Sequence, residues 1–489
     1  MFYRSIVSHL TIFNKVNGQV CHKMEQQIDF IFKAQQAYKY TLRTNNASVR
    51  IAKLRRLKDV IEKNEAKIYQ AFKQDLRKSE FETAVTEVIF TYGEIDFAIK
   101  NLNSWMRPKR VGKTASSFFA KNRIYYEPKG TCLIISPWNY PFQLTVGPLV
   151  SAIAAGNCAI IKPSEMSPAV ADVVADILKE VFDEKEVACI KGNADVSTAL
   201  LKLPFDHIFF TGSTAIGKIV MEAAAKNLTS VTLELGGKSP TIIDEKVDLE
   251  SAATKIAWGK LVNSGQTCIA PDHVFIHESL RDYFIGLYKT AVNKMYFNAK
   301  GDIDKSVYGK IINQKNYERL KNLSNEAIEK GARIDFGGTF DDANHTINPI
   351  VLTNVQTGSK VMEEEIFGPI LPIITYTHLD KVIEQINNGS KPLALYIFSK
   401  NEKNVKHIIK NTSAGGTCVN DVLIHISNPK LPFGGVNGSG MGSSHGFYGF
   451  KNFSHERSVV FQSSINFNKM IYPPYHGKEW VLKLLKKLM

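Results

Sequence analysis

The sequence predicts an α/β protein with two doubly wound parallel domains and a small β arm. Two series of short apolar strands alternate with helical stretches, one over residues 131–235 and one over residues 239–399. Alternation of this kind produces parallel sheets whose ligands lie at the carboxyl ends of the strands. The length of 489 residues is sufficient for two or three domains.

The domain boundaries follow from where these patterns start and stop. Residues 1–23 look foreign to the first domain, so we expect a disordered extension, or a misassigned start, before Met24. The expected segments are 24–113 with 128–234 for the first domain, 235–418 for the second, 114–127 with 449–465 for the arm, and 466–489 for a tail.

The region before the first strand series is predicted to be helical. Apolar residues recur every three to four positions in 49–72 and again in 81–105, and Pro108 ends the second run. In contrast, 116–119 and 124–126 have the composition of strands. These two strands suit an arm that leaves the domain.

The strands of the two series are short, and helices separate them. In the first series we expect strands at 131–136, 157–162, 186–191, 207–211 and 231–235, with helices at 144–155 and 169–182. In the second we expect strands at 241–244, 273–276, 371–376 and 396–399, with helices at 249–262 and 280–292. Two domains with a cleft between them is the simplest arrangement.

Composition excludes several classes of protein. The net charge of +14 is spread along the chain without an aromatic and basic motif, so we expect no nucleic-acid partner. The six cysteines have no short pairs, so we expect no disulfide framework, no metal and a reducing compartment, the cytoplasm. No apolar run approaches the roughly 18 residues of a membrane span.

Cys268 is the candidate nucleophile. It lies in the stretch 262–272, shortly before Pro271, which would break a helix and leave the thiol facing a cleft. Nucleophilic chemistry needs the thiolate, so the thiol requires partners that lower its pKa or remove its proton. A single cysteine, taken alone, is more often a buried small hydrophobe.

Two other stretches offer such partners. Glu234 lies between Leu233 and Leu235, where burial would raise its pKa and allow it to act as a base near neutrality. Asn139 follows the first strand and offers an amide donor suited to an oxyanion. Each residue alone is more readily explained as structural.

A phosphate-binding loop is indicated at 211–218, which follows a strand and opens a helix. Gly212 and Gly217 would let backbone amides approach an anion at the helix N-terminus. Ile219 stands where a nucleotide triphosphate loop has Ser or Thr, and the third glycine of the ordinary dinucleotide fingerprint is absent. A dinucleotide site and a plain helix start both remain open on this evidence.

Two further stretches fit a dinucleotide. Lys162-Pro163-Ser164-Glu165 follows a strand, and a carboxylate there would accept hydrogen bonds from ribose hydroxyls and repel a 2′-phosphate, which favours NAD over NADP. The segment 364–369 offers a carboxylate and an aromatic ring for a ribose and a flat ring. The glycine-rich segment 434–442 lacks a strand-to-helix context and is expected to be a turned or mobile loop lining the cleft.

Together these motifs resemble the aldehyde dehydrogenase superfamily over about residues 30–475. Their order matches, and so does the separation between Glu234 and Cys268. Three further stretches are similar to the class 3 and fatty-aldehyde branch of that superfamily: 419–425, 431–435 and 453–455.

The resemblance implies a mechanism. Cys268 would attack the aldehyde carbon, while Asn139 and the Cys268 backbone N–H would hold the oxyanion. Hydride would pass to NAD(P)⁺ on the first domain, and Glu234 would activate the water that hydrolyses the thioester. The second domain would be the catalytic domain.

The resemblance also implies ligand contacts. Members with Glu at the position of Glu165 include some that accept both cofactors, so NADP use remains open. The implied cofactor residues are Lys162 and Glu165 at the adenine ribose, Gly212, Ser213 and Gly217 at the pyrophosphate, and Glu365 and Phe367 at the nicotinamide and its ribose. The candidates for the substrate pocket are Tyr92, Tyr140 and His425.

We therefore expect oxidation of medium- to long-chain aliphatic or aromatic aldehydes to carboxylic acids. One alternative releases the acyl group to coenzyme A; Glu234 argues against it, because a retained base favours water. A second alternative is a non-catalytic protein that keeps the fold, against which Cys268 and Asn139 argue.

The chain ends in a basic amphipathic helix, which can lie on an anionic membrane but cannot span one. Docking of this helix on the protein itself is equally compatible with the pattern. Its apolar face is expected to carry Trp480, Val481, Leu484, Leu485 and Leu488. The arm at 114–127 resembles the segment through which family members pair, which implies an obligate oligomer, and the resemblance to the class 3 branch favours a homodimer over a tetramer.

Overall fold

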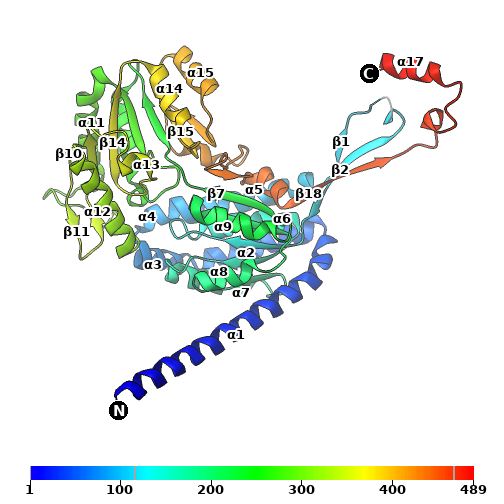
Figure 1. Cartoon of the computed structure of the whole chain (residues 1–489), viewed down its shortest axis with the longest axis horizontal. Helices are drawn as coiled ribbons and strands as arrows, with labels where there is room; N and C mark the ends of the chain where they lie inside the picture. The colour runs from blue at the N-terminus through cyan, green and yellow to red at the C-terminus, as the bar shows by residue number, and fades with distance from the viewer. Residues whose placement is uncertain (1, 115–116, 466–467, 489) are drawn as a thin grey trace.

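The computed structural model describes residues 2–114, 117–465 and 468–488, and it contains two large sheets flanked by helices (Figure 1). The six-stranded sheet has the order β17-β7-β6-β3-β4-β5. Its strands are β3 (Thr131–Ile135), β4 (Cys158–Lys162), β5 (Val187–Cys189), β6 (His207–Gly212), β7 (Ser230–Leu235) and β17 (Gly440–Met441). The predicted α/β fold is confirmed.

The seven-stranded sheet has the order β10-β13-β14-β9-β8-β15-β16. Its strands are β8 (Pro240–Ile243), β9 (His273–His277), β10 (Arg333–Phe336), β13 (Ile350–Thr353), β14 (Ile370–Tyr376), β15 (Ala394–Phe398) and β16 (Gly416–Val419). All pairings are parallel except the edge pair β10–β13.

Four strands of the two sheets were not predicted: β10, β13, β16 and β17. β10 is half-exposed along its length, and β17 has two residues, one of them a glycine. β17 pairs antiparallel with β7, placing Gly440 opposite Glu234. The six-stranded sheet is therefore completed by a segment that follows the whole seven-stranded sheet in the chain.

The arm is a separate three-stranded sheet that leaves the body of the molecule (Figure 1). It consists of β1 (Lys109–Val111), β2 (Lys121–Pro128) and β18 (Ser454–Phe461). The strand expected at 116–119 is wrong for the described residues 117–119, which form a turn. The Ser117 hydroxyl closes this turn, accepting hydrogen bonds from the Thr114 backbone N–H and the Asn122 side chain, both at 3.0 Å.

The N-terminal region is helical, as predicted, but without the expected break near Met24. A single helix, α1, spans Phe2–Arg43 where a disordered extension was expected for 1–23. These residues contain no proline and one glycine, Gly18, so nothing in the sequence stops the helix. In Figure 1 α1 projects beyond the rest of the molecule.

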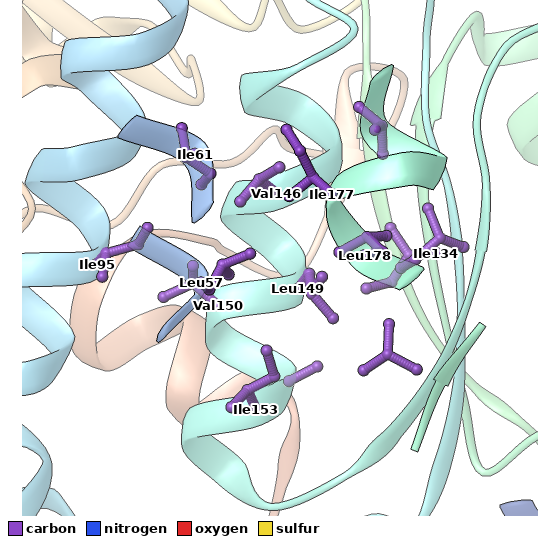
Figure 2. Close-up of a cluster of buried hydrophobic side chains, with 14 of the residues drawn as sticks. Leu57, Ile61, Ile95, Ile134, Val146, Leu149, Val150, Ile153, Ile177 and Leu178 are labelled. Carbon is purple, nitrogen blue, oxygen red and sulfur yellow. The ribbon is translucent and has the colours of Figure 1, made fainter. Parts of the chain in front are cut away.

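Helices α6 (Gln143–Ala155) and α7 (Pro168–Val181) pack on one face of the six-stranded sheet, and α2 (Ala47–Lys63) and α5 (Ile89–Trp105) pack on these two helices. Figure 2 shows apolar side chains of the four helices in one cluster, with Ile134 of β3 at its edge. Leu57, Ile61, Ile95 and Leu149 are completely buried here. Apolar burial of this kind, worth about 25 cal/mol per Å², fixes the strands whose carboxyl ends carry the site described next.

The tail ends in helix α17 (Glu479–Leu488). Of the residues expected on its apolar face, Val481 is buried and Trp480 is 56% exposed. The side chains of Leu484, Leu485 and Leu488 lie outside the described residues. Of the helices that the structure describes, none is long and apolar enough to cross a membrane.

Candidate active site

A cavity of about 620 Å³ opens at the carboxyl ends of β6 and β7 and of the stretch after β3. It brings together side chains of the six-stranded sheet and side chains of segments that connect the strands of the seven-stranded sheet. Seven of the predicted site residues line it: Asn139, Gly212, Ser213, Glu234, Cys268, Glu365 and Phe367.

The segment 262–272, which carries the candidate nucleophile Cys268 and is called the nucleophile loop below, follows helix α10 (Leu249–Leu261) through a tight left-handed turn. Asn263, Ser264 and Gly265 all have positive φ, between 53° and 77°. A Cβ on Gly265 would lie 2.4 Å from the Gly368 carbonyl, so only glycine fits there. The Glu82 carboxylate accepts a hydrogen bond from the Asn263 backbone N–H at 2.8 Å. The turn delivers Cys268 to the cavity in a half-buried position.

Asn139 is tied to this loop. Its side-chain amide donates to the Gln266 carbonyl at 3.1 Å, and the Asn263 side chain donates to the Asn139 carbonyl at 2.8 Å. One N–H of the Asn139 amide is thereby used to hold the loop. The other can serve as a donor to a group bound at Cys268.

Cys268 carries a thiol that is neutral near pH 7. Burial, with Glu365 and Glu234 nearby, raises its pKa to about 12, against the opposing effect of the backbone N–H groups of Cys268 and Ile269. Two carboxyl groups facing a thiol disfavour the thiolate. A positive charge brought into the cavity would have the opposite effect.

Glu234 lies near the end of β7 and is 5% exposed. Burial raises its pKa to about 7, while the Ser444 hydroxyl, which donates to its Oε1 at 3.0 Å, and His445 lower it. Its Oε2 is buried without a hydrogen-bond partner among the described residues. A carboxyl group of this kind can exchange a proton with water near neutrality.

Glu365 and Phe367 lie across the cavity from these groups on the loop that follows Glu364. The Glu365 Oε1 is buried without a partner among the described residues, and burial, with Asp272 nearby, raises its pKa to about 8. The Arg319 guanidinium holds this loop by donating to the Glu365 carbonyl. Phe367 contacts the Trp138 ring edge-to-face, at 5.4 Å between centroids. A carboxyl group with one oxygen left without a partner among the described residues, beside a fixed aromatic ring, fits a ribose and a flat ring.

The glycine loop matches the prediction in part. Gly212 and Ser213 line the cavity, and Ser213 caps helix α9 (Thr214–Ala225). Gly217 lies inside α9, where a Cβ would meet the Leu235 side chain at 2.6 Å. Its expected approach to a ligand is therefore corrected: Gly217 allows close packing of the helix on β7, which orients the loop.

Lys162 and Glu165 lie at the carboxyl end of β4, outside the lining of this cavity. Their side chains form an ion pair at 3.1 Å, and Lys162 also donates to the Pro163 carbonyl at 2.9 Å. Lys162 is buried, whereas the Glu165 side chain is 46% exposed. A half-exposed carboxylate held beside a lysine can still accept hydrogen bonds from hydroxyls.

Tyr92 and Tyr140 are not among the residues that line the cavity, which corrects the expected substrate pocket. On α5, Phe90 and Glu94 share the face that lines it, and Tyr92, two residues from each, lies on another side. The Tyr92 hydroxyl donates to Glu65 at 2.6 Å.

Tyr140 supports the nucleophile loop from behind. Its buried hydroxyl is 2.7 Å from the Thr267 hydroxyl, and the Lys78 ammonium lies 4.2 Å from its ring centroid. These contacts fix the residue before Cys268 and leave Tyr140 no surface on the cavity.

His425 is also outside the lining. It packs on Phe433, which does line the cavity, and its Nδ1 is 3.4 Å from the Cys418 sulfur. Burial lowers its pKa to about 4, so the ring is neutral near pH 7. Phe433 therefore takes the place expected for His425.

Comparison with known proteins decides which family this site belongs to. The sequence profile of the aldehyde dehydrogenase family matches residues 8–459. The chain belongs to the aldehyde dehydrogenase family. It is 45% identical to the mouse aldehyde dehydrogenase family 3 member A2, over 92% of this chain and 91% of that protein. It is 44% identical to a mouse aldehyde dehydrogenase described as dimeric and NADP-preferring, over 89% of this chain and 95% of that protein.

A solved structure of AldH from Staphylococcus aureus, in a substrate-bound state, superposes on this aldehyde dehydrogenase with a TM-score of 0.89. The two are 43% identical, and the match covers 94% of this chain and 99% of that one. The predicted resemblance to the class 3 branch is confirmed. The chain is an oxidoreductase that acts on aldehydes with NAD or NADP.

Three residues of this aldehyde dehydrogenase site were not predicted: Glu94, Ser444 and His445, all of which line the cavity. Ser444 and His445 follow the glycine-rich segment 434–442, where the sequence has no periodicity to indicate which way a side chain points. The signal that was available is the Ser443-Ser444-His445 triplet directly after those glycines. In the described part of the chain, no cluster of His, Cys, Asp or Glu is arranged to hold a metal ion.

Proposed function

We propose that this enzyme oxidises medium- to long-chain aliphatic or aromatic aldehydes to carboxylic acids, with Cys268 as nucleophile and Glu234 as base. The observation that supports this most directly is that Cys268, Asn139 and Glu234 line one cavity. Their approach is produced by strand ends and a strained loop, which suits a preorganised site.

The first step is attack of the Cys268 sulfur on the aldehyde carbon, which makes a C–S bond and a thiohemiacetal oxyanion. The free thiol, with its pKa raised to about 12, gives up its proton to solvent as it attacks. The second amide N–H of Asn139 and the Cys268 backbone N–H would hold the oxyanion. Bound NAD(P)⁺ supplies the hydride acceptor and a positive ring charge that favours the thiolate.

In the second step the oxyanion collapses, hydride leaves the former aldehyde carbon, and a thioester on Cys268 remains. Glu234 then removes a proton from water, whose oxygen attacks the thioester carbonyl. The C–S bond breaks, releasing the carboxylic acid and the Cys268 thiolate. The unpaired Glu234 Oε2 is the oxygen free to take that proton.

The cofactor contacts proposed are those of Glu365 and Phe367 at the nicotinamide end and of Gly212 and Ser213 at the pyrophosphate. The orphaned Glu365 Oε1 and the capped start of α9 support these assignments. Lys162 and Glu165 would hold the adenine ribose. The Glu165 carboxylate would repel a 2′-phosphate, so we expect NAD to be preferred over NADP.

The substrate class is proposed from the cavity wall. Apolar side chains dominate it on the side of Glu94 and Glu234, including Phe90, Leu144 and Phe433. An apolar wall favours hydrocarbon aldehydes by about 0.8 kcal/mol per buried methylene.

A homodimer is proposed to form through the arm. β1 and β18 leave apolar side chains in solvent, with Val111, Val460 and Phe461 between 46% and 59% exposed. The 44% identical mouse enzyme described as dimeric supports the same assembly. Light scattering of the purified protein measures it directly, and a monomer mass at micromolar concentration would contradict it.

We also propose that the enzyme is cytoplasmic and that its tail makes reversible contact with membranes. α17 has Lys483, Lys486 and Lys487 beside the exposed Trp480 and Leu482. The test compares the full chain with one that lacks residues 477–489. If the deletion changes neither binding to anionic liposomes nor the chain-length profile, this contact is wrong.

The central experiment measures NADH formed from NAD⁺ and hexanal, then decanal and benzaldehyde, with NADP⁺ in parallel. Cys268→Ala should abolish NADH production, whereas Cys189→Ala, which removes a half-buried thiol outside the cavity, should not. Added coenzyme A should yield no acyl thioester. Oxidation that survives Cys268→Ala would overturn the proposed mechanism.

A further inference from the structure

Glu94 and His445 form a buried pair beside the proposed base. Glu94, on α5, is 7% exposed, and its Oε1 lies 3.0 Å from the His445 Nδ1. The second carboxylate oxygen of Glu94 accepts a hydrogen bond from the Gly446 backbone N–H at 3.2 Å. Both oxygens of Glu94 thus hold the short segment 444–446 in place.

The same segment touches Glu234. Ser444, the residue before His445, donates its hydroxyl hydrogen to the Glu234 Oε1 at 3.0 Å. Glu94, Ser444, His445 and Glu234 all line the cavity. A shift of the segment would therefore move the hydrogen bond to Glu234 and the His445 ring together.

Aromatic rings hold the His445 ring in place. Phe90 and Phe433 both meet it edge-to-face, with centroids at 5.4 and 5.2 Å. Apolar walls of this kind reduce screening, so a charge on the ring acts strongly on its neighbours.

We propose that Glu94 and His445 are positioning residues for Glu234: the contacts of Glu94 with His445 and Gly446 fix the segment 444–446, and this segment holds the Ser444 hydroxyl on the Glu234 carboxylate, which keeps Glu234 oriented and able to activate water. This role rests on the proposed function of Glu234 as the base. Neither Glu94 nor His445 needs to touch the substrate.

Each titratable group around this pair has a defined part. Glu94 faces it from α5, Glu234 from β7, Cys268 from the nucleophile loop and His425 from the segment after β16. His425, with its pKa lowered to about 4, and Cys268, with its pKa raised to about 12, are both neutral near pH 7. Despite burial, His445 and the Gly446 N–H keep the pKa of Glu94 below its usual value, so Glu94 is the anion that pairs with the ring.

The first test compares His445→Gln and Glu94→Gln with His407→Gln. His407 is a matched control, because its Nε2 pairs with Asp380 at 2.6 Å on the surface. Loss of the contacts that hold this segment should weaken the Ser444 hydrogen bond to Glu234, and should therefore raise the pH at which turnover reaches half its maximum by about 0.5 to 1 unit. Below that pH, turnover should fall about three- to tenfold. The pre-steady-state NADH burst and KM should not change.

Two results would overturn the proposal. An unshifted pH profile in His445→Gln, or an equal shift in His407→Gln, would show that the pair does not act on Glu234. Loss of the burst together with turnover would show a structural role.

A second measurement is independent of activity. In protein with isotope-labelled histidine, the NMR signal of His445 is the one missing from His445→Gln. Glu94→Gln should move this signal, because the substitution changes the hydrogen bond to the His445 Nδ1, whereas His407→Gln should leave it in place. An unmoved signal in Glu94→Gln would overturn the proposal, whereas absence of aldehyde oxidation with a moved signal would overturn only the proposed function.

Discussion

The Asn139 side-chain amide donates a hydrogen bond to the carbonyl of Gln266, two residues before Cys268, at 3.1 Å. In the proposed mechanism one residue has two tasks, because the amide group that holds this loop keeps a second N–H for the oxyanion. The placement of the thiol would then be coupled to the stabilisation of the charge that its attack produces.

Asn139→Ala should lower kcat/KM by about 100- to 1,000-fold, as removal of a single oxyanion donor does in other enzymes. The loss of the Gln266 contact should also slow alkylation of Cys268 by iodoacetamide. The control is Asn101→Ala, which removes an amide bonded to the Phe97 carbonyl on α5, outside the cavity. Unchanged kcat/KM in Asn139→Ala would refute the oxyanion assignment.

Glu234→Gln should preserve the pre-steady-state NADH burst and reduce steady turnover by about 100-fold or more, because only hydrolysis needs the base. Stopped-flow absorbance at 340 nm measures both phases. A burst that disappears with turnover would mean that Glu234 also takes part in the attack by Cys268.

Turnover in the unaltered enzyme should rise with pH through about 7. The sign follows from the raised pKa of Glu234, whose active form is the carboxylate and therefore accumulates above about pH 7. Steady-state kcat between pH 5.5 and 9 measures this limb, with saturating hexanal and NAD⁺. If turnover instead rises through about pH 4.5, the usual range of an exposed carboxyl, then burial does not control the pKa of Glu234.

Gly236→Ala should weaken NAD⁺ binding by about tenfold or more. A Cβ at this position would lie 2.0 Å from the Glu365 Oε2, which forces the carboxylate to move at a cost of about 1 to 3 kcal/mol. Quenching of tryptophan fluorescence by NAD⁺ gives the Kd. Gly286→Ala is the matched control, since its Cβ would meet no atom within 4 Å. An equal Kd for NAD⁺ in the two variants would show that Glu365 does not contact the cofactor.

Tyr140→Phe should leave the aldehyde profile unchanged and lower the free energy of unfolding by about 1 kcal/mol, because it removes only the hydrogen bond to Thr267. Thermal unfolding and a kcat/KM series over aldehyde length measure the two effects. A changed preference for aldehyde length would show that Tyr140 does contribute to the substrate pocket.

Much of the fold could be predicted because the strands of the two series are apolar and evenly interrupted by helices. Two central residues could be placed for the same reason: Asn139 follows the end of β3 and Glu234 lies near the end of β7, and carboxyl ends of parallel strands meet at one edge. The edge strands β10 and β17 escaped prediction, since polar or glycine-rich segments carry no periodic signal.

The substrate side of the site could not be predicted by residue type alone. Tyr92 looked suitable, but the position of a side chain around a helix depends on its rotation, and the π-helical turn Ala84–Val88 just before α5 alters that rotation. Phe433, not His425, lies on the cavity wall, and the two rings pack on each other. Ser444 contacts Glu234 across 210 positions of the chain, so no local pattern in the sequence indicates this contact.

The antiparallel pairing of Gly440 with Glu234 has a consequence for synthesis of the chain. While the ribosome is still making the second domain, β7 is an open sheet edge, and the glutamate on it lacks the serine that orients it. The six-stranded sheet closes only after residues 440–445 have emerged. In the proposed mechanism, a nascent chain therefore becomes able to hydrolyse the thioester only near the end of its synthesis. A chain truncated before Gly440 would leave β7 as an unpaired edge strand that can pair with another chain.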